Sequence, residues 1–260
     1  MLYTRVITAV IAIPIIAIAV YLGGLWFTAS VILYGLVAGW EYVHMMKKGN
    51  YNPNLVVTLG LMVLLIAQGY WPSLDLGVIV SIGLVVSIIW QMFRAKSPAP
   101  TADWALAVTG GLYIGWGLGR LVALRQLPNG LAWAYLALAA TWMADTFAYL
   151  IGRTFGCHKF WPRLSPNKTW EGCYGELLGG LVGAAMIIPF FKLGWTPALI
   201  AGILAAVVAV FGDLSVSMMK RHVGVKDSSN LFPGHGGFLD RIDSLLLVNI
   251  VIYYYAAWLS

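Results

Sequence analysis

Residues 76–93 read LGVIVSIGLVVSIIWQMF, and this run contains no charged side chain. Its length matters because a helix needs about 20 mostly apolar residues to cross the hydrocarbon core of a bilayer. The whole chain has the same character, since 60% of its 260 residues are hydrophobic and 10% are charged, whereas soluble domains have about 25% charged residues. Its mean hydropathy is +0.82. We therefore predict an integral membrane protein. The composition excludes a disordered chain, a disulfide-rich domain and a nucleic-acid-binding protein.

Further apolar runs on both sides of this segment predict an all-α fold with about nine transmembrane helices. Trp and Tyr gather at many ends of these runs, where such side chains anchor helices at the membrane interfaces. The fifth run contains Arg120, whose side chain we expect to extend toward the nearer interface. The first run follows Arg5 like a signal peptide, but it lacks a cleavage site of small residues and is predicted to be retained. The predicted spans are residues 6–23, 25–43, 54–71, 76–93, 104–124, 131–152, 174–191, 195–216 and 242–259.

The positions of Lys and Arg predict the orientation of the chain. Thirteen of the sixteen cationic residues fall on one side of the nine predicted spans, and only Arg120, Arg125 and Lys192 fall on the other. Because cytoplasmic loops carry an excess of Lys and Arg, we predict a cytoplasmic N-terminus and a C-terminus outside. We expect one membrane domain in the inner membrane of a bacterium. Its N-terminal transmembrane helices occupy residues 1–100, and its C-terminal helices with cytosolic catalytic loops occupy residues 101–260.

Acidic residues inside the predicted spans need an explanation, because an unpaired charge is costly in the bilayer. Asp145 lies inside the sixth span, and Asp213 lies near the cytosolic end of the eighth. Glu176 opens the seventh span, and Asp243 opens the ninth with Asp240 just ahead of it. For Glu176 or Asp243 alone, a helix cap or a buried salt bridge is the simpler interpretation. For Asp145 and Asp213 together we favour function, because carboxylates converging from separate helices suit a hard divalent cation such as magnesium.

The two longest polar loops follow the sixth and eighth predicted spans. The first contains Ser165 and Lys168, and the second, residues 217–243, mixes cations with acids around Gly236 and Gly237. Glycines let backbone N–H groups approach phosphate oxygens, and Lys and Arg balance the phosphate charge. Neither loop is a Walker A motif, because no Gly-Lys-Ser/Thr follows the glycines. A loop that only sets topology would explain the cations but not the acids among them. We therefore predict phosphate binding on the cytosolic face.

The second loop resembles the signature of the phosphatidate cytidylyltransferase (CDP-diacylglycerol synthase) family. This resemblance implies a mostly helical membrane enzyme for phospholipid biosynthesis, whose site lies in a cytosol-facing, lipid-accessible cavity. It implies that CTP and phosphatidic acid are converted to CDP-diacylglycerol and pyrophosphate, with magnesium as cofactor. The first loop and the helix before it are similar to the family's second block. The matching segments are Ser217-x-Met219-Lys220-Arg221, Lys226-Asp227-x-Ser229, Phe232-Pro233-x-His235-Gly236-Gly237-Phe238-x-Asp240-Arg241-Ile242-Asp243, Asp145…Tyr149-x-x-Gly152-Arg153 and Ser165-Pro166-x-Lys168-Thr169-x-Glu171-Gly172.

The resemblance also suggests a role for each polar residue. As a hypothesis, a phosphate oxygen of phosphatidic acid attacks the α-phosphorus of CTP, and metal ions and cations supply positioning and charge stabilisation. The predicted catalytic residues are Asp213, Asp240, Lys226 and Asp227. The predicted metal ligands are Asp213, Asp240, Asp243 and Asp145, for one or two ions. The predicted substrate-binding residues are Ser165, Lys168, Ser217, Lys220, Arg221, His235, Gly236, Gly237 and Arg241.

Several interpretations stay open at this point. Asp227 could orient Lys226, and His235 could transfer a proton or only fix the backbone. Tyr149 and Trp170 could stack on cytosine, although anchoring at the membrane interface explains them as well. The 29 glycines allow close helix packing either within the chain or in a homodimer.

Two other functions fit parts of the pattern. A CTP-dependent lipid-alcohol kinase also combines membrane spans, a nucleotide and a metal. An ion-coupled transporter could use Asp145 and Asp213 as a relay, but the polar residues gather at one interface rather than near the midplane.

Overall fold

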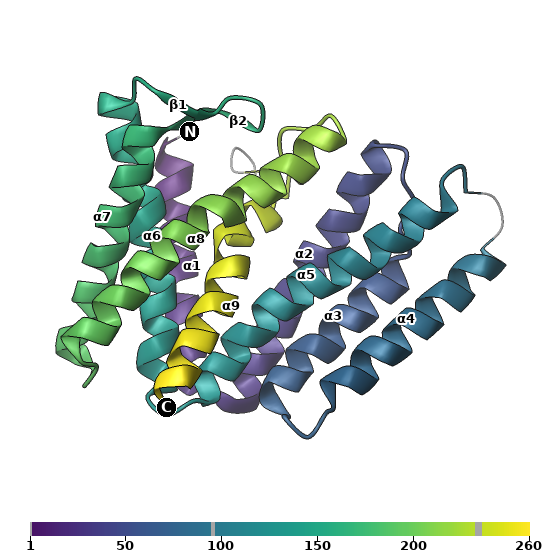
Figure 1. The fold of residues 1–260 in the computed structure, drawn as a ribbon, viewed down its shortest axis with the longest axis horizontal. Coiled ribbons are helices and arrows are strands. Elements are labelled where there is room, and N and C mark those ends of the chain that lie inside the picture. The colour runs from purple at the N-terminus through teal and green to yellow at the C-terminus, as the bar shows by residue number, and fades with distance from the viewer. Residues whose placement is uncertain (1, 95–96, 232–235) are drawn as a thin grey trace. The chain divides into compact units, whose positions relative to one another are not determined.

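The computed structural model describes residues 2–94, 97–231 and 236–260. Within these residues the chain is mostly helical and forms nine α-helices, so each predicted span corresponds to a helix (Figure 1). One small antiparallel hairpin, β1–β2, is an addition to the predicted all-helical fold. The elements are α1 (Leu2–Leu22), α2 (Gly24–Lys48), α3 (Leu55–Tyr70), α4 (Leu76–Phe93), α5 (Pro100–Gln126), α6 (Gly130–Phe155), β1 (Lys159–Trp161), β2 (Ser165–Thr169), α7 (Trp170–Ile187), η1 (Ile188–Phe190), α8 (Trp195–His222) and α9 (Leu239–Leu259).

Local capping explains where several helices begin. The side chain of Asn54 accepts hydrogen bonds from the N–H groups of Val56 and Val57 and so caps α3. Asp75 caps α4 and Thr169 caps α7 in the same way. Such side chains satisfy N–H groups that have no partner inside the helix. The polar residues at these positions therefore fix helix starts that the apolar pattern leaves imprecise.

Six helices among the described residues are long and apolar enough to cross a membrane. They are α4, α5, α6, α7 together with η1, α8 and α9. The described apolar part of α1, Ala12–Leu22, and the helix α3 are shorter. On α4, the exposed side chains of Val78, Ile82, Val85 and Ile89 follow a helical stripe. An exposed apolar stripe on a helix of this length faces lipid, and the chain is an integral membrane protein.

The chain forms two compact units. Unit 1 comprises Met1–Ala123 and Lys220–Arg241, and unit 2 comprises Leu124–Met219 and Ile242–Ser260. The predicted division separates N-terminal helices, residues 1–100, from C-terminal helices with the catalytic loops, residues 101–260. This division stays a prediction.

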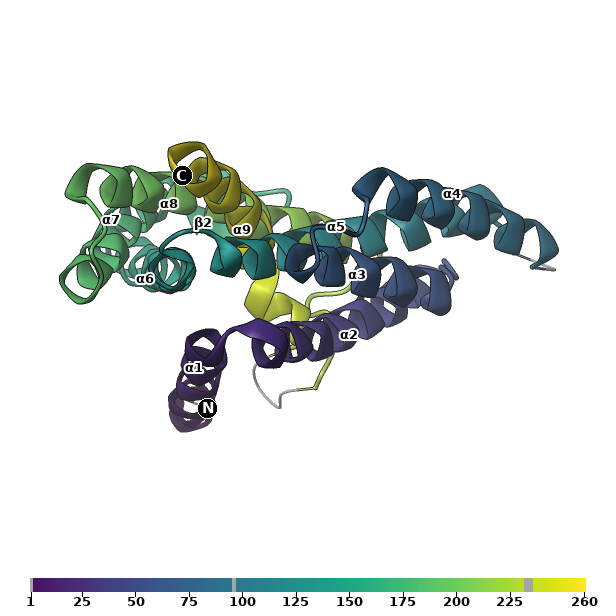
Figure 2. The ribbon, with the colours of Figure 1, turned by 90° about the horizontal axis from the view of Figure 1, so that it is seen from below.

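In unit 1, α3 packs against both α2 and α4 (Figures 1 and 2). Glycines permit the close approach of α3 to its neighbours. A Cβ atom added at Gly39 of α2 would lie 3.2 Å from the sulfur of Met62, and one added at Gly115 of α5 would lie 2.7 Å from the Cα of Met62. Small residues at such crossings are typical of helix packing in membranes, where dispersion contacts replace the hydrophobic effect.

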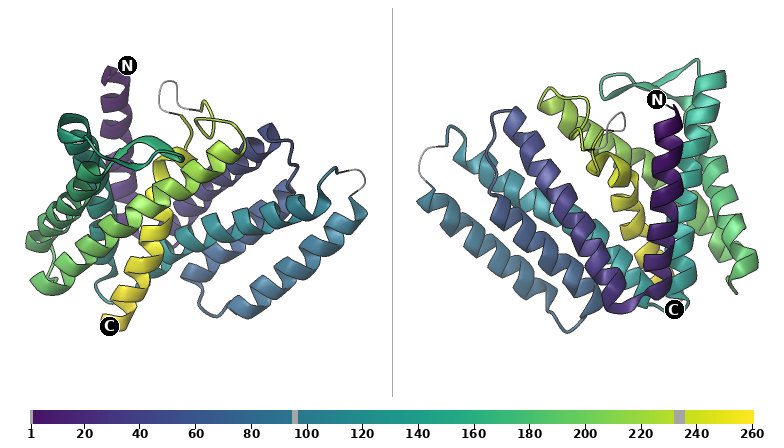
Figure 3. Two further views of the ribbon diagram at one scale, coloured as in Figure 1. Left: turned by 45° about the horizontal axis from the view of Figure 1, so that its top comes forward. Right: turned by 180° about the vertical axis from the view of Figure 1, so that it is seen from behind.

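In unit 2, α6 and α7 lie side by side, and the β1–β2 hairpin joins their ends (Figures 1 and 3). Glycines on one face of α7 press against the backbone of α6. A Cβ atom at Gly175 would lie 2.8 Å from the carbonyl oxygen of Phe147, and one at Gly179 would collide with the carbonyl oxygen of Met143. The core of the unit is rich in alanine, including the fully buried Ala137, Ala140, Ala201, Ala205 and Ala209.

This packing predicts different effects for the same substitution at two glycines. Gly179→Ala should destabilise the protein by roughly 1–3 kcal/mol, because the added methyl group collides with backbone that cannot move aside. Gly60→Ala in α3 should leave stability unchanged or raise it, since nothing lies within 4 Å of the new Cβ and Ala favours a helix. Thermal unfolding of both variants in detergent compares them. Equal melting temperatures would contradict the packing argument.

Candidate functional site

Lys168 of β2 is the centre of a charged cluster in unit 2. Its ammonium nitrogen lies 3.0 Å from Oδ2 of Asp213 and donates a hydrogen bond to the carbonyl oxygen of Val210 at 3.2 Å. The Lys168 side chain is 17% exposed and that of Asp213 is 31% exposed. Asp213 also accepts a hydrogen bond from the hydroxyl of Ser217, one turn later on α8, at 3.3 Å. The structure thus brings together three predicted site residues.

Two further carboxylates act on the charge of Lys168. Burial alone would lower the pKa of Lys168, but the nearby carboxyl groups of Glu176, Asp213 and Asp145, with a hydrogen bond to Asp213, outweigh burial and raise this pKa. The lysine therefore remains a cation at neutral pH. We call Lys168, Asp213, Glu176 and Asp145 the Lys168 cluster. Its members come from β2, α8, α7 and α6.

Glu176 and Asp145 differ in their surroundings. Glu176 is 1% exposed, and its buried Oε2 atom has no hydrogen-bond partner. Asp145 is exposed although it lies inside α6, and its Oδ1 accepts a hydrogen bond from the hydroxyl of Ser244 at 3.4 Å. Ser244 also donates its N–H to Asp243, which is 8% exposed. The predicted metal ligands Asp145 and Asp243 are thus linked through one serine in unit 2.

The β1–β2 hairpin sets the position of Lys168. Its register pairs Lys159 with Thr169, and the hydroxyl of Thr169 accepts the N–H of Gly172 at 3.1 Å, which starts α7 directly after the strand. Glu171 accepts hydrogen bonds from the N–H of His158 and contacts its Nδ1 at 2.6 Å. These contacts close the open end of the hairpin and join it to the start of α7. Ser165, the other predicted residue of this loop, lies at the start of β2 and is half-buried.

A second charged cluster lies in unit 1, around Asp240 in the first turn of α9. Oδ1 of Asp240 accepts a hydrogen bond from Lys220 at 2.7 Å. Its Oδ2 accepts three more, from the N–H and the hydroxyl of Ser228 and from the N–H of Gly237, at 2.9–3.0 Å. The side chains of Lys220 and Asp240 are 9% and 7% exposed. This is a buried, fully bonded ion pair.

Glu41 of α2 belongs to the same cluster, and the sequence analysis missed it. The residue is fully buried, and it accepts hydrogen bonds from both Ser228 and Ser229. A signal was available, because Glu41 is an acid inside the predicted span 25–43, like Asp145 in its own span. We call Glu41, Lys220, Ser228, Ser229 and Asp240 the Asp240 cluster.

The other predicted residues of the second loop lie around the Asp240 cluster. Gly236 has a φ of 77°, which favours glycine, and a Cβ added there would lie 2.8 Å from Oδ2 of Asp240. Arg221 donates to the carbonyl oxygen of Val225 at 3.0 Å. His235 lies outside the described residues. The remaining predicted residues are exposed, and they are Lys226, Asp227 and Arg241.

The two aromatic residues with open interpretations are both about half-exposed. The hydroxyl of Tyr149 accepts a hydrogen bond from Arg153 at 2.7 Å, and the ring of Trp170 packs edge-on against Phe160 with centroids 4.7 Å apart. Both have partners in unit 2, and stacking of either ring on cytosine stays a prediction.

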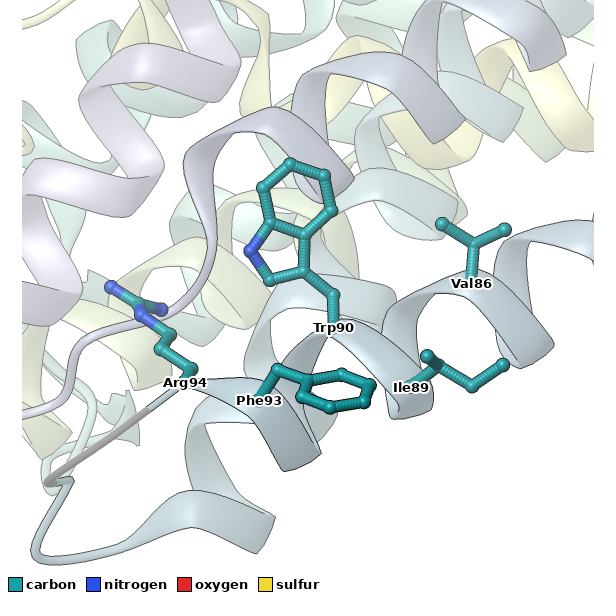
Figure 4. Close-up of a pocket in the computed structure, with 5 residues that line it drawn as sticks. All are labelled: Val86, Ile89, Trp90, Phe93 and Arg94. Carbon is teal, nitrogen blue, oxygen red and sulfur yellow. The ribbon is translucent and has the colours of Figure 1, made fainter.

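A groove on α4 is apolar and holds none of the predicted site residues (Figure 4). The one charge at its edge, Arg94, donates to the carbonyl oxygen of Asn52 at 2.6 Å. An arginine beside aromatic rings at a helix end is typical of a membrane interface. The groove is lined by Val86, Ile89, Trp90, Phe93 and Arg94.

Helices of membrane-spanning length define the class, an integral membrane protein, and two clusters in it pair a lysine with carboxylates. Comparison with known proteins narrows this class. A profile described as the cytidylyltransferase family matches residues 3–259, and the chain belongs to this family.

Curated relatives cover nearly the full length. A phosphatidate cytidylyltransferase of Staphylococcus saprophyticus is 34% identical over 249 residues, which are 94% of this chain and 95% of the relative. Another from Staphylococcus haemolyticus is 34% identical over 250 residues, with the same coverage. The phosphatidate cytidylyltransferase of Bacillus subtilis is 31% identical over 263 residues and covers 98% of both chains.

The burial of the Lys220–Asp240 pair predicts that removal of one partner is costly. Lys220→Met should destabilise the protein by roughly 3–5 kcal/mol, because it leaves the carboxylate of Asp240 buried without its cation. Lys48→Met is the matched control, since Lys48 is exposed at the end of α2. Thermal unfolding in detergent measures both. A Lys220→Met protein as stable as the Lys48→Met protein would refute this account of the pair.

Proposed function

We propose that this protein transfers the cytidylyl group of CTP to phosphatidic acid, giving CDP-diacylglycerol and pyrophosphate for phospholipid biosynthesis. The observation that carries the proposal is the similarity, over 94–98% of the chain, to relatives named phosphatidate cytidylyltransferase. The two charged clusters support it, because they place cations and carboxylates on the segments that contain the family's motifs.

The reaction joins two anions, so charge is its main obstacle. A phosphate oxygen of phosphatidic acid forms a new bond to the α-phosphorus of CTP, and the bond from this phosphorus to the bridging oxygen of the β-phosphate breaks. The oxygen is already ionised near neutral pH, so no strong general base is needed. Protein cations stabilise the charge on the phosphoryl oxygens during such transfers. Lys168 suits this role, because its neighbours keep it protonated.

The chemistry of the Lys168 cluster fits magnesium. Carboxylate oxygens are ligands that Mg²⁺ prefers, and this ion is usually held by one or two carboxylates together with substrate phosphates. The described residues contain no group of three or more His, Cys, Asp or Glu side chains arranged to hold a metal. When bound, magnesium would neutralise charge on the phosphates.

We propose Asp213 and Asp145 as the carboxylates that hold this ion. Asp145 is exposed, and the buried Oε2 of Glu176 is a further acceptor without a partner in the same cluster. Asp240 already accepts four hydrogen bonds, which favours a role in organising its loop. Ligation by Asp240 or Asp243 and a second ion stay predictions.

The exposed cations Arg221, Lys226 and Arg241 are our candidates for binding the phosphates of CTP or of the lipid, with Asp227 orienting Lys226. Ser165 offers a hydroxyl group on the same strand, β2, as Lys168. Ser217 offers one on α8, one turn after Asp213. The N–H of Gly237 is engaged by Asp240, so this glycine serves by leaving room for its neighbours. For Gly236 and His235 we keep a role in binding substrate phosphate.

We further propose nine membrane spans, a cytoplasmic N-terminus, an external C-terminus and a site that faces the cytosol in a bacterial inner membrane. Support comes from the excess of Lys and Arg on one side of the spans, the six long apolar helices and the bacterial relatives. A homodimer stays a prediction, which the mass of the purified protein in detergent tests.

An assay of the purified protein with CTP, phosphatidic acid and magnesium tests the activity directly. CDP-lipid and pyrophosphate should appear in equal amounts. With CTP labelled separately on its α- and γ-phosphates, the α label and the cytidine should end on the lipid. Transfer of the γ label instead would show a lipid kinase, and cation flux into proteoliposomes without CTP would favour a transporter.

The metal proposal predicts a strong effect at Asp213. Asp213→Asn should lower kcat by about 100- to 1,000-fold, because it removes a charged group from the reacting centre while keeping its shape. Size-exclusion chromatography checks that the variant is folded. The double variant Lys47→Gln, Lys48→Gln is the control and should keep its kcat, since these exposed residues end α2 and serve topology. Near-normal turnover of Asp213→Asn with an unchanged magnesium dependence would rule out this residue as a ligand.

A further inference from the structure

We infer that Glu41 is a positioning residue for the proposed cytidylyl transfer. From inside helix α2 it fixes two segments of the second polar loop, Ser228–Ser229 and Phe238–Leu239. The inference rests on the proposed function for its effect on activity. Its structural part stands on contacts within unit 1.

The first observation is the set of donors around Glu41. Oε1 accepts hydrogen bonds from the hydroxyl of Ser229 at 2.5 Å and from the N–H of Phe238 at 2.9 Å. Oε2 accepts from the hydroxyl of Ser228 at 3.2 Å and from the N–H of Leu239 at 2.7 Å. Both oxygens are thus used twice, and the residue is 0% exposed. Hydrogen bonds to an ionised acceptor are stronger than those between neutral groups.

The donors lie at both ends of the stretch between α8 and α9. Ser228 and Ser229 come soon after α8, whereas Phe238 and Leu239 are at the start of α9. Helix N-termini leave N–H groups without partners and carry partial positive charge, so a carboxylate is a suitable cap. Here the cap comes from another helix, nearly two hundred residues earlier in the chain. Figure 2 shows the segment after α8 passing beside α2.

Glu41 therefore determines where α9 begins, and Asp240 follows one residue later. Asp240 binds the same serine, Ser228, and the same end of the loop through Gly237. A Cβ atom at Gly237 would lie 2.6 and 2.8 Å from the two oxygens of Glu41, so a side chain there would displace the carboxylate. Glu41 and Asp240 therefore bind backbone N–H groups of the same short segment, Gly237–Leu239.

The rest of α2 supports this contact. Tyr34 lies seven residues before Glu41 and so on the same face of the helix. Its ring centroid is 5.5 Å from that of Phe238. The helix thus contacts the start of α9 with an aromatic ring and a carboxylate, and both contacts involve residues of the second polar loop.

Only a carboxylate satisfies this arrangement. Four donors converge on two oxygens, and an amide would direct its own N–H groups at two of those donors. Asp would keep the charge but would be one methylene too short to reach all four. The residues held in this way include neighbours of Lys226, Asp227 and Arg241, which we assign to phosphate binding. A displacement of about 1 Å in such groups costs about 100-fold in rate.

The test compares Glu41→Gln with Tyr42→Phe in the full-length protein. Tyr42 is the next residue of α2 and is also buried, but its hydroxyl donates to the carbonyl oxygen of Leu106 in α5 and not to the loop. Glu41→Gln should lower kcat/KM for CTP by about 100-fold. Tyr42→Phe should stay within about threefold of the wild type, although each loses a buried hydrogen bond. Glu41→Asp should lie between Gln and the wild type.

Hydrogen–deuterium exchange gives a readout that does not depend on activity. The amides of Phe238 and Leu239 should exchange faster in Glu41→Gln than in Tyr42→Phe. Unchanged exchange there, or equal losses of kcat/KM in both variants, would overturn the inference. If Glu41→Gln does not fold, Ser229→Ala removes one of the four donors and should show the same changes on a smaller scale. A wild-type protein without cytidylyl transfer would instead refute the proposed function, and the exchange result would still decide the role of Glu41 in holding the loop.

Discussion

A charge in an apolar chain needs partners, and this constraint decides where the polar residues of the protein lie. Lys168 is kept charged by acids from three helices, and Lys220 is matched by Asp240. Glu41 is buried, and N–H and O–H donors surround it. Since a buried charge without a partner is expensive, these buried charges are found in clusters with their partners.

Glycine is the complementary constraint. Close crossings such as Gly175 against Phe147 bring helix backbones within reach of each other, so short carboxylates on α6, α7 and α8 can act on one lysine. Bulkier residues at these crossings would separate the helices that supply the Lys168 cluster. The abundance of glycine in the chain thus serves its electrostatics as well as its packing.

The sequence predicted the helices well because apolar runs of membrane length allow few alternatives. Helices α4 and α9, for example, can be identified from their own apolar runs, without knowledge of what packs against them. It did not predict the hairpin over KFWPRLSPNKT, where two prolines and scattered charges hide the strands. The membership of the clusters was predicted in part. Asp213 and Lys168 were both candidates, but their pairing joins residues 45 positions apart, which no periodicity indicates. Glu41 was missed because its partners lie nearly two hundred residues away, and two of its four donors are backbone N–H groups, which leave no mark in a sequence.

The hydroxyl of Ser228 lies within hydrogen-bonding distance of both Glu41 and Asp240, at 3.2 and 3.0 Å. A hydroxyl group has one hydrogen, so it serves the two carboxylates in alternation or shares a bent bond between them. The carboxylate that the hydroxyl does not bind at a given moment relies more on its other donors. The two acids therefore do not behave independently, because rotation about a single C–O bond redistributes hydrogen bonding between helix α2 and the first turn of α9.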